Sequence, residues 1–346
     1  MPDEHRPLTS QLPYLTTTPG VGGKIKQSPE DFFVEELPAY ELSGEGEWLF
    51  LLIEKRDLST PALVDHISDV LGIPRDQIGT AGRKDGFAVT RQFVCVPARA
   101  FESADQIETD RLTVLEQRRH GNKLRTGHLR GNRFRIQLRN VSINAAGQTD
   151  AIVSELKLVG FPNWFGDQRF GARDDSDDLG LRLLRGERTR RLRKDGLRFA
   201  LSAAQSRLFN YWGAARIRDG LSHRVLSGDV MQVAASGGPF VVQDVPTEQA
   251  RFDDRETMLT GPIFGPKMKQ PDSEAAEREQ LVLNDFDLTP ESFELFRRLT
   301  MGTRRPLLAF VDDLEATPTA DGLQLCFSLP SGTYATSLLR EICKDG

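Results

Sequence analysis

The segment GTAGRKDGFAVTRQ, residues 79–92, joins a glycine-containing bend to the start of a strand. Beyond the bend, the side chains alternate with the two-residue period of a β-strand. One face carries Phe87, Val89, Phe93 and Cys95, and the other carries Ala88, Thr90, Gln92 and Val94. The segment therefore predicts a sheet with three charged residues, Arg83, Lys84 and Asp85, at the mouth of one strand.

Asp85 fits two interpretations. In an Asp-Gly turn, Gly86 takes a positive φ and the carboxylate caps a neighbouring N–H. In a functional site, a nearby cation keeps the carboxylate ionised, because an opposite charge within about 4–6 Å lowers an aspartate pKa by about 1–3 units. The local pattern alone favours the turn, and it does not reveal which cation, if any, pairs with Asp85.

The flanking segments predict more of the same sheet. Residues 31–38 and 47–54 have strand-like patterns, and another strand begins at Arg133. A helix is expected over residues 60–71, with Thr60 as N-cap candidate, Pro61 at the first helical position and Gly72 just past the end. Residues 150–159 predict a second helix, which Gly160 and Pro162 terminate.

Helical periodicity dominates the middle of the chain. In residues 199–218 an apolar stripe leaves three arginines for a solvated side: Arg207, Arg216 and Arg218. Strand patterns return near residue 304, and residues 333–342 have helical spacing. We therefore expect an α+β chain, in which residues 1–160 and 305–346 form one domain around a mixed, largely antiparallel sheet. Residues 161–304 form a second, inserted α/β domain.

Positive charge is concentrated in two runs, although the 346-residue chain has a net charge of −5. Residues 117–139 contain eight Lys and Arg and no acid, and residues 182–198 contain eight against Glu187 and Asp195. A single charged run is usually a solvated face. Two such runs in an acidic protein favour an anionic partner, RNA first, because phosphate contacts depend on local charge.

Several kinds of chemistry are not indicated. Cys95, Cys326 and Cys343 are far apart and the five His do not cluster, so neither structural zinc nor a disulfide framework is expected. Phosphate-loop, GxGxxG, GxSxG and HExxH motifs are absent. We predict no metal and no cofactor, which leaves a carboxylate acting as nucleophile or general base.

Localisation follows from the same composition. The N-terminus has no apolar signal core, and no apolar run approaches the ~20 residues of a membrane span. We expect a cytoplasmic protein with no membrane partner and no obligatory protein partner.

The segment AGRKDGFAVTRQ closely resembles the motif around the catalytic aspartate of the TruD family of pseudouridine synthases. Other segments match that family in the same order: GKIKQSPEDFFVEE (23–36), RHGNKLRTGHLRGNRFRI (119–136), PNWFGDQRFG (162–171), LSAAQSRLFNYW (201–212) and LPSGTYATSLLREI (329–342). The ordered blocks span nearly the whole chain, so the resemblance also implies the fold: a pseudouridine-synthase-like catalytic domain with an inserted TRUD domain.

The resemblance implies a cofactor-free isomerase that converts uridine to pseudouridine in RNA, with Asp85 as the catalytic aspartate. In bacterial members of the family the uridine is at position 13 of certain tRNAs. It leaves open whether the carboxylate forms an adduct or removes a proton on a glycal route. The residues expected to contact substrate or RNA are Lys26, Arg83, Lys84, His128, Arg130, Asn132, Phe134 and Arg169. A flipped base needs such a stacking ring and such hydrogen-bond partners.

Two rival functions use the same residues differently. An RNA-binding or RNA-remodelling module would keep the fold and the basic runs without depending on Asp85. A nucleoside or glycoside hydrolase would need a second essential acid beside Asp85. Glu30 and Asp31 are the candidates for that second acid.

Overall fold

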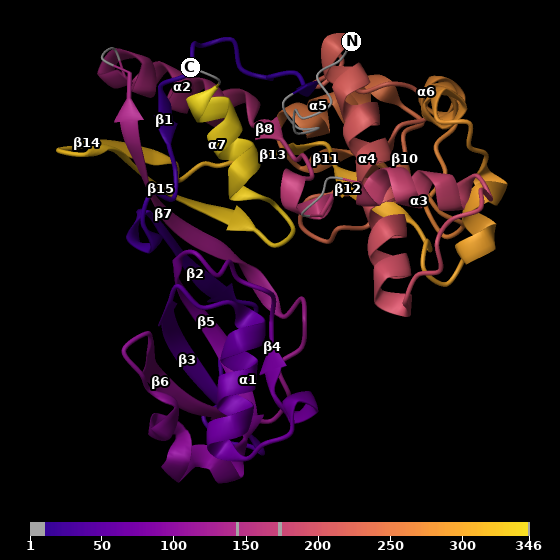
Figure 1. Cartoon of the computed structure of the whole chain (residues 1–346). Coiled ribbons are helices and arrows are strands. Elements are labelled where there is room, and N and C mark those ends of the chain that lie inside the picture. The colour runs from indigo at the N-terminus through magenta and orange to yellow at the C-terminus, as the bar shows by residue number, and fades with distance from the viewer. Residues whose placement is uncertain (1–10, 143–144, 172–174, 345–346) are drawn as a thin grey trace. The chain divides into compact units, whose positions relative to one another are not determined.

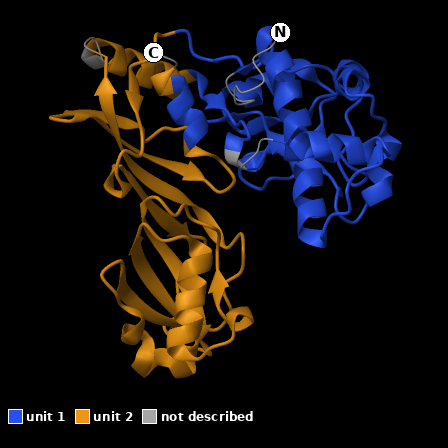
Figure 2. Cartoon of the chain, viewed as in Figure 1, with its two compact units in different colours: residues 1–17, 159–310, 336–341 blue, residues 18–158, 311–335, 342–346 orange. Residues whose placement is uncertain are grey.

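The computed structural model describes residues 11–142, 145–171 and 175–344. The chain forms two compact units, each assembled from separated segments (Figure 2). Unit 1 comprises residues 1–17, 159–310 and 336–341, and unit 2 comprises residues 18–158, 311–335 and 342–346. Both units therefore draw on the two ends of the chain.

Unit 2 is built around one mixed sheet, labelled in Figure 1. Its helices are α1 (Thr60–Leu71) and α2 (Ala145–Val159), and α2 ends at the division between the units. The strands are β1 (Gly22–Lys24), β2 (Phe32–Pro38), β3 (Trp48–Arg56), β4 (Gly79–Thr80), β5 (Val89–Pro97), β6 (Leu112–His120), β7 (Leu129–Val141), β14 (Glu315–Thr319) and β15 (Gly322–Pro330).

The order of the described strands is β14-β15-β7-β2-β5-β3-β6, with β1 added on β7 and β4 on β5. Strands β2 and β5 run parallel, whereas the other neighbouring pairs of described strands are antiparallel. The predicted mixed, largely antiparallel sheet is thus confirmed. Strands β14 and β15, in residues 315–330, join a sheet whose other strands lie in residues 22–141, so residues 159–310 interrupt unit 2 in the sequence.

Helix α1 packs one face on this sheet. Leu63 and Ile67 join an apolar cluster with Leu49, Leu51 and Ile53 of β3. Gly72 ends the helix with a φ of 62°, as its sequence position predicted. The N-cap is Ser59 and not Thr60: the Ser59 Oγ accepts the Ala62 N–H at 3.3 Å. The Thr60 side chain is instead buried in unit 2, where its hydroxyl oxygen accepts the N–H of Lys84, the residue before Asp85.

Unit 1 contains the helical middle of the chain together with short strands. Its helices are α3 (Ser176–Leu184), α4 (Lys194–Arg218), α5 (Val245–Asp253) and α6 (Ser273–Asp285), and residues 336–341 of α7 (Ala335–Cys343) belong to it. The strands are β8 (Phe161–Pro162), β9 (Val230–Val233), β10 (Pro239–Val241), β11 (Thr257–Ile263), β12 (Thr303–Pro306) and β13 (Leu308–Ala309).

The divisions between the units differ from the expected domain bounds at 160/161 and 304/305. Residues up to 310 stay with unit 1 because β12 pairs with β11 and β13 pairs with β8. The segment before residue 18 also belongs there, since the Glu341 carboxylate accepts the Thr16 N–H at 3.0 Å and the Thr16 hydroxyl at 2.6 Å. Naming unit 2 catalytic and unit 1 the TRUD domain remains our proposal.

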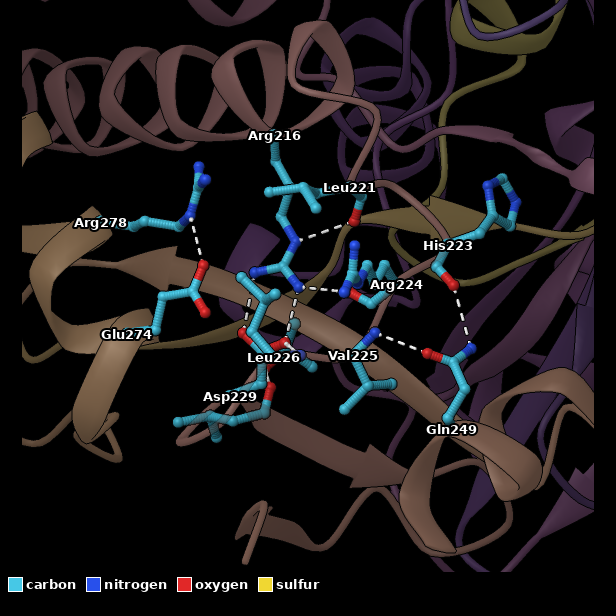
Figure 3. A network of polar contacts seen from close by, with 12 residues as sticks. Arg216, Leu221, His223, Arg224, Val225, Leu226, Asp229, Gln249, Glu274 and Arg278 are labelled. Carbon is cyan, nitrogen blue, oxygen red and sulfur yellow. Dashed lines mark hydrogen bonds and ion pairs between the residues drawn. The ribbon is translucent and has the colours of Figure 1, made fainter. Parts of the chain in front are cut away.

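Arg216 on α4 is buried, contrary to the solvated position that helical periodicity predicted. Its guanidinium forms two hydrogen bonds to the Asp229 carboxylate, at 2.8 and 2.6 Å (Figure 3). It also donates to the Leu221 and Arg224 carbonyls at 3.1 and 2.8 Å. The side chain thereby holds the loop after α4, because each of these hydrogen-bond partners lies in residues 221–229.

The described part of the chain contains neither a membrane-spanning helix nor a cluster of metal-binding side chains. None of the helices within residues 11–142, 145–171 and 175–344 has both the length and the apolar character that crossing a bilayer requires. Over the same ranges, no group of three or more His, Cys, Asp or Glu side chains is arranged to hold a metal ion.

Candidate active site

The bend that carries Asp85 is held against the sheet at its entry. Strand β4 pairs with β5, and a Cβ on Gly79 would lie 2.4 Å from the Leu124 carbonyl oxygen and 2.6 Å from the Cys95 Sγ. Only glycine fits there without displacing backbone. Two residues on, the Ala81 carbonyl accepts the Gly127 N–H at 2.8 Å. The bend therefore leaves the sheet from a defined point.

The Asp85 carboxylate accepts a hydrogen bond from the Lys26 ammonium and forms an ion pair with it. The two side chains are 29% and 21% exposed, so the pair is accessible from solvent without being fully hydrated. Gly86 does not have a positive φ, and the turn interpretation of the Asp-Gly pair is wrong in that respect. The carboxylate is directed at a cation 59 residues away in the chain.

Lys26 reaches Asp85 from a strained backbone. Its φ of 55° lies in the left-handed region, which costs a non-glycine residue about 1–3 kcal/mol and persists only where its surroundings impose it. The Asp31 carboxylate imposes it here by accepting the N–H groups of Gln27 and Ser28, each at 3.0 Å. Strained residues of this kind are concentrated at functional sites.

Asp31 is itself a structural carboxylate. It is buried and accepts hydrogen bonds from the Arg139 guanidinium at 2.8 and 3.0 Å. Hydrogen bonding to Arg139 holds the pKa of Asp31 below its ordinary value. Glu30 forms an exposed surface pair with Arg56. Neither acid is placed as a second free carboxylate beside Asp85, which disfavours the hydrolase.

Arg83 and Lys84 differ in their surroundings. Arg83 is exposed. The Lys84 ammonium lies 2.5 Å from the Glu36 carboxylate, and the two side chains are only 8% and 1% exposed. The Lys84 N–H donates to the Thr60 Oγ at 2.8 Å. Lys84 thus ties the bend to β2 and α1, so its ammonium does not face solvent as a phosphate contact would require.

An aromatic group lines the sheet next to Lys26. The Lys26 ammonium lies 4.4 Å from the centroid of the Phe32 ring, and Phe32 meets Phe134 edge-on at 6.2 Å. Phe134 also stacks on Phe327, with centroids 5.2 Å apart. Phe134 is buried by these neighbours. Phe134 is thus linked to Lys26 through the Phe32 ring, and its role as a stacking ring for a flipped base stays a prediction.

Asn132 lies on β7, two residues before Phe134. Gly131 precedes it, where a Cβ would lie 2.3 Å from the Leu329 carbonyl oxygen of β15, so glycine permits this pairing. The Asn132 Oδ1 is buried and has no hydrogen-bond partner among the described residues. An amide oxygen in this position can accept a hydrogen bond from a ligand without displacing a protein donor.

His128 lines a pocket of about 390 Å³ on the basic run. Its Nδ1 lies 3.2 Å from the Tyr40 hydroxyl, and the Tyr40 ring stacks on His120 at 5.0 Å. Lys123 and Arg125 also line the pocket, together with the acid Glu41. Arg130, two residues after His128, is exposed. The pocket combines cations and aromatic rings, as a nucleotide site requires.

Arg169 lies in unit 1, on a short 3₁₀ turn at Asp167–Arg169. Its guanidinium donates to the Ser206 hydroxyl at 3.1 Å and to the Ser202 hydroxyl, both on α4. It also lies 5.5 Å from the centroid of the Phe165 ring. Phe165 and Phe170 belong to the unit 1 core.

Sequence reasoning missed two charged residues, Glu36 and Lys55, that hold the bend. The Lys55 ammonium donates to the Asp85 carbonyl at 3.2 Å, and Glu36 pairs with Lys84. The alternating pattern of the two strands could have indicated that both residues are buried. Lys55 continues the inward-facing series of Leu49, Leu51 and Ile53, and Glu36 follows Phe32 and Val34 on one face. A charge in such a buried position has a specific partner.

Comparison with known proteins agrees with this arrangement. A model of the family described as tRNA pseudouridine synthase D (TruD) matches residues 9–193 and 188–342. A tRNA pseudouridine synthase D of Thermus thermophilus is 41% identical over 347 residues, covering 96% of this chain and 92% of its own. That of Anaeromyxobacter dehalogenans is 38% identical over 341 residues and covers 97% of each chain.

A solved structure shows the same fold. A Methanosarcina mazei protein described under the TruD name superposes with a TM-score of 0.78 at 25% sequence identity, over 96% of each chain. The family model and the relatives each span nearly the whole chain. This chain therefore belongs to the TruD family.

Proposed function

We propose that this protein isomerises uridine to pseudouridine in tRNA, at position 13, and that Asp85 is its catalytic carboxylate. Family membership supports the activity. The observation that carries the assignment of Asp85 is its pairing with Lys26, in an accessible position at the end of a bend. A carboxylate that is held by one partner and stays accessible can act as nucleophile or base.

The reaction is balanced without any added reagent. The N1–C1′ bond of the uridine breaks, the uracil rotates, the C5–C1′ bond forms, and the C5 proton is lost while N1 gains one. The Asp85 carboxylate supplies either a temporary bond to the substrate or a base for a proton on the glycal route. No oxidant, reductant or cofactor enters the balance, so we propose a cofactor-free enzyme.

The surrounding residues take complementary roles. Lys26 holds the Asp85 carboxylate, and the Asn132 Oδ1 is an acceptor for an N–H of the flipped uracil. Phe134 and its aromatic neighbours form the apolar wall beside them. The RNA backbone is contacted by Arg83, His128, Arg130 and Arg169. We assign Lys84 to holding the bend instead, because its ammonium pairs with Glu36.

The partner in this proposal is tRNA, in the cytoplasm, with no obligatory protein subunit. Of the eight Lys and Arg in residues 117–139, Arg118, Arg133 and Arg139 pair with carboxylates. Within the described residues, the other five form no ion pair with a carboxylate: Arg119, Lys123, Arg125, Arg130 and Arg135. Cations that no carboxylate neutralises support phosphate binding.

The test is Asp85→Asn, which preserves the shape of the side chain and removes its charge. Loss of a general base lowers turnover by about 10²–10⁴, whereas loss of a covalent nucleophile can lower it by about 10⁶, as in serine proteases. Pseudouridine formation is measured under single-turnover conditions, beside tRNA affinity. Asp76→Asn, at an exposed carboxylate of the same unit, is the matched control.

We expect Asp85→Asn to lose turnover and keep tRNA affinity. Substantial residual turnover by this variant contradicts the assignment of Asp85. Release of free uracil by the unaltered protein supports the hydrolase, and RNA refolding by Asp85→Asn at the unaltered rate supports an additional remodelling role. Mapping pseudouridine across total RNA from cells with and without the gene identifies the substrate position.

A further inference from the structure

Lys55 is a lysine that solvent does not reach, directly behind the proposed catalytic residue. It lies on β3, and its relative exposure is 0%. Its ammonium donates to the Leu58 carbonyl and to the Asp85 carbonyl, the latter at 3.2 Å. Within the described residues, no carboxylate lies within ion-pair distance of Lys55. Lysine is almost never fully buried without a charged partner, so this position requires an explanation.

Asp85 is contacted by a lysine at each end. Lys26 pairs with its carboxylate from the accessible side, and Lys55 donates to its main-chain carbonyl from the buried side. Lys84, the residue immediately before Asp85, forms an ion pair with Glu36. Lys55 therefore acts on the peptide unit from which the carboxylate extends, and a shift of that unit moves the carboxylate.

The charged groups facing the Lys55 ammonium come from two elements. Burial lowers the pKa of Lys55 from its ordinary value of 10.5 to about 8; Lys84 also lowers it, whereas Asp85 and Glu36 raise it. The residues opposite Lys55 on the neighbouring strands, Thr90 and Leu112, are uncharged. At neutral pH Lys55 is therefore mostly protonated, although burial opposes the charge.

We propose that Lys55 is a positioning residue of the isomerisation: its buried ammonium fixes the Asp85 carbonyl and so orients the Asp85 carboxylate toward the target uridine. This inference rests on the proposed function of Asp85. The alternative is that Lys55 only supports the fold, by closing the turn at Leu58. The two roles are distinguished by pH, because deprotonation of Lys55 affects the folding stability and the turnover rate in opposite directions.

Folding stability changes with pH because the folded pKa of Lys55, about 8, lies below its unfolded value of 10.5. Between these two values the unfolded chain binds more protons than the folded chain, so this group makes the protein more stable as pH rises. A positioning ammonium does the opposite for catalysis, because its charge is lost as pH passes about 8. Turnover that falls while stability rises is the signature of positioning.

The variants are Lys55→Met, which removes the donor, and Lys55→Arg, which keeps a charge at every accessible pH. Arg56→Met is the matched control, at an exposed cation next along β3. For Lys55→Met we expect the single-turnover rate constant to fall by about 10²-fold, the loss that a misplacement of about 1 Å produces. Its tRNA affinity should stay unchanged, because Lys55 has no exposed surface.

The pH profile gives the second readout. The single-turnover rate of the unaltered protein should decline above about pH 8, and in Lys55→Arg this decline should disappear. Folding in each variant is checked by circular dichroism. If neither variant folds, the unaltered protein is compared with Lys26→Arg, which removes the other amine of the site. A decline near pH 8 shared by these two proteins supports the proposal, and its absence from the unaltered protein overturns it.

A folded Lys55→Met that isomerises tRNA at the unaltered rate also overturns the inference, as does a rate that rises with stability across pH 8–10. Failure of the underlying function is distinguishable. If Asp85→Asn remains active, the role of Asp85 is wrong, whereas an inactive Asp85→Asn beside a fully active Lys55→Met rejects only the positioning role.

Discussion

Lys26 and Asp85 show how two ordinary residues become a reactive pair. The Asp31 carboxylate holds the backbone N–H groups after Lys26, and this permits a φ of 55° that lysine otherwise avoids. The strained backbone carries the ammonium to the Asp85 carboxylate. A carboxylate with one cationic partner keeps lone pairs for a substrate, because it can accept about four hydrogen bonds.

Replacement of Lys26 by Met should therefore lower turnover without abolishing tRNA binding. A hydrogen bond to a charged group contributes about 1.5–3 kcal/mol, which corresponds to roughly 10–10²-fold in rate. Lys26→Arg should recover part of this loss because it restores the charge. Single-turnover pseudouridine formation and tRNA affinity are the two measurements. Equal losses in Lys26→Met and Lys26→Arg would indicate that the charge is not what matters.

At the scale of elements, two strands of unit 2 carry a charged residue at a position where their alternating pattern predicts a buried apolar one. Glu36 ends the buried face of β2 and Lys55 ends that of β3, and both contact the bend. In unit 1, helix α4 likewise carries a buried charged residue, Arg216, which forms hydrogen bonds to Asp229 in the loop after the helix. In each case the buried charge connects a regular element to an irregular segment.

Arg216→Met should strongly destabilise the protein. The substitution leaves the Asp229 carboxylate buried without its cation, and breaking a buried pair in this way costs about 3–5 kcal/mol. Arg218→Met, at an exposed position on the same helix, is the control and should change little. The free energy of unfolding in urea measures both.

The double variant Arg216→Met/Asp229→Asn is a further check, because it removes the unpaired charge as well. We expect it to be more stable than Arg216→Met. A loss below about 1 kcal/mol in Arg216→Met would mean that the pair behaves like a surface ion pair.

At the scale of the whole molecule, each unit carries one of the basic runs. In unit 2, Lys123 and Arg125 of residues 117–139 line the pocket at His128, and Arg119, Arg130 and Arg135 of the same run form no ion pair with a carboxylate of the described residues. In unit 1, Arg182 and Arg185 of the other run pair with Glu187. Six more cations of that run are exposed and form no ion pair with a carboxylate of the described residues: Arg188, Arg190, Arg191, Arg193, Lys194 and Arg198. The net charge of −5 therefore gives no indication of these two basic runs.

Binding of tRNA should weaken steeply with salt. Each neutralised phosphate contributes roughly 0.7–0.9 to the slope of log affinity against log salt, so five contacts predict a slope of about −4. Replacing Arg188, Arg190 and Arg191 by Ala should reduce the slope by about 2.4 when all three contact phosphates. The triple Ala variant at Arg119, Arg125 and Arg130 tests unit 2 in the same way. Arg75, Arg111 and Arg297, which form surface ion pairs, provide the control triple.

A slope near zero for the unaltered protein contradicts phosphate binding by either run. A change in only one triple variant assigns the contact to that unit. The affinity is measured by filter binding between 50 and 200 mM salt, a range over which a slope of about −4 predicts a change of about 10²-fold.

Local patterns predicted much of this fold. Helix α1 ends at Gly72, β5 alternates as expected, and strands from both ends of the chain share one sheet. These features depend on residues close in sequence, whose periodicity selects the face that is buried. Periodicity was wrong for Arg216 because it registers only hydrophobicity, and a fully hydrogen-bonded arginine can occupy a buried position.

The sequence by itself determined the family, the sheet and the position of Asp85 at the mouth of a strand. Only the tertiary structure decided which charges meet. Asp85 pairs with Lys26, 59 residues away, rather than with its neighbours, and Lys84 turns to Glu36, 48 residues away. The physical reason is that an ion pair depends on distance and burial in the folded chain, and both are set by the packing of segments that are remote in sequence.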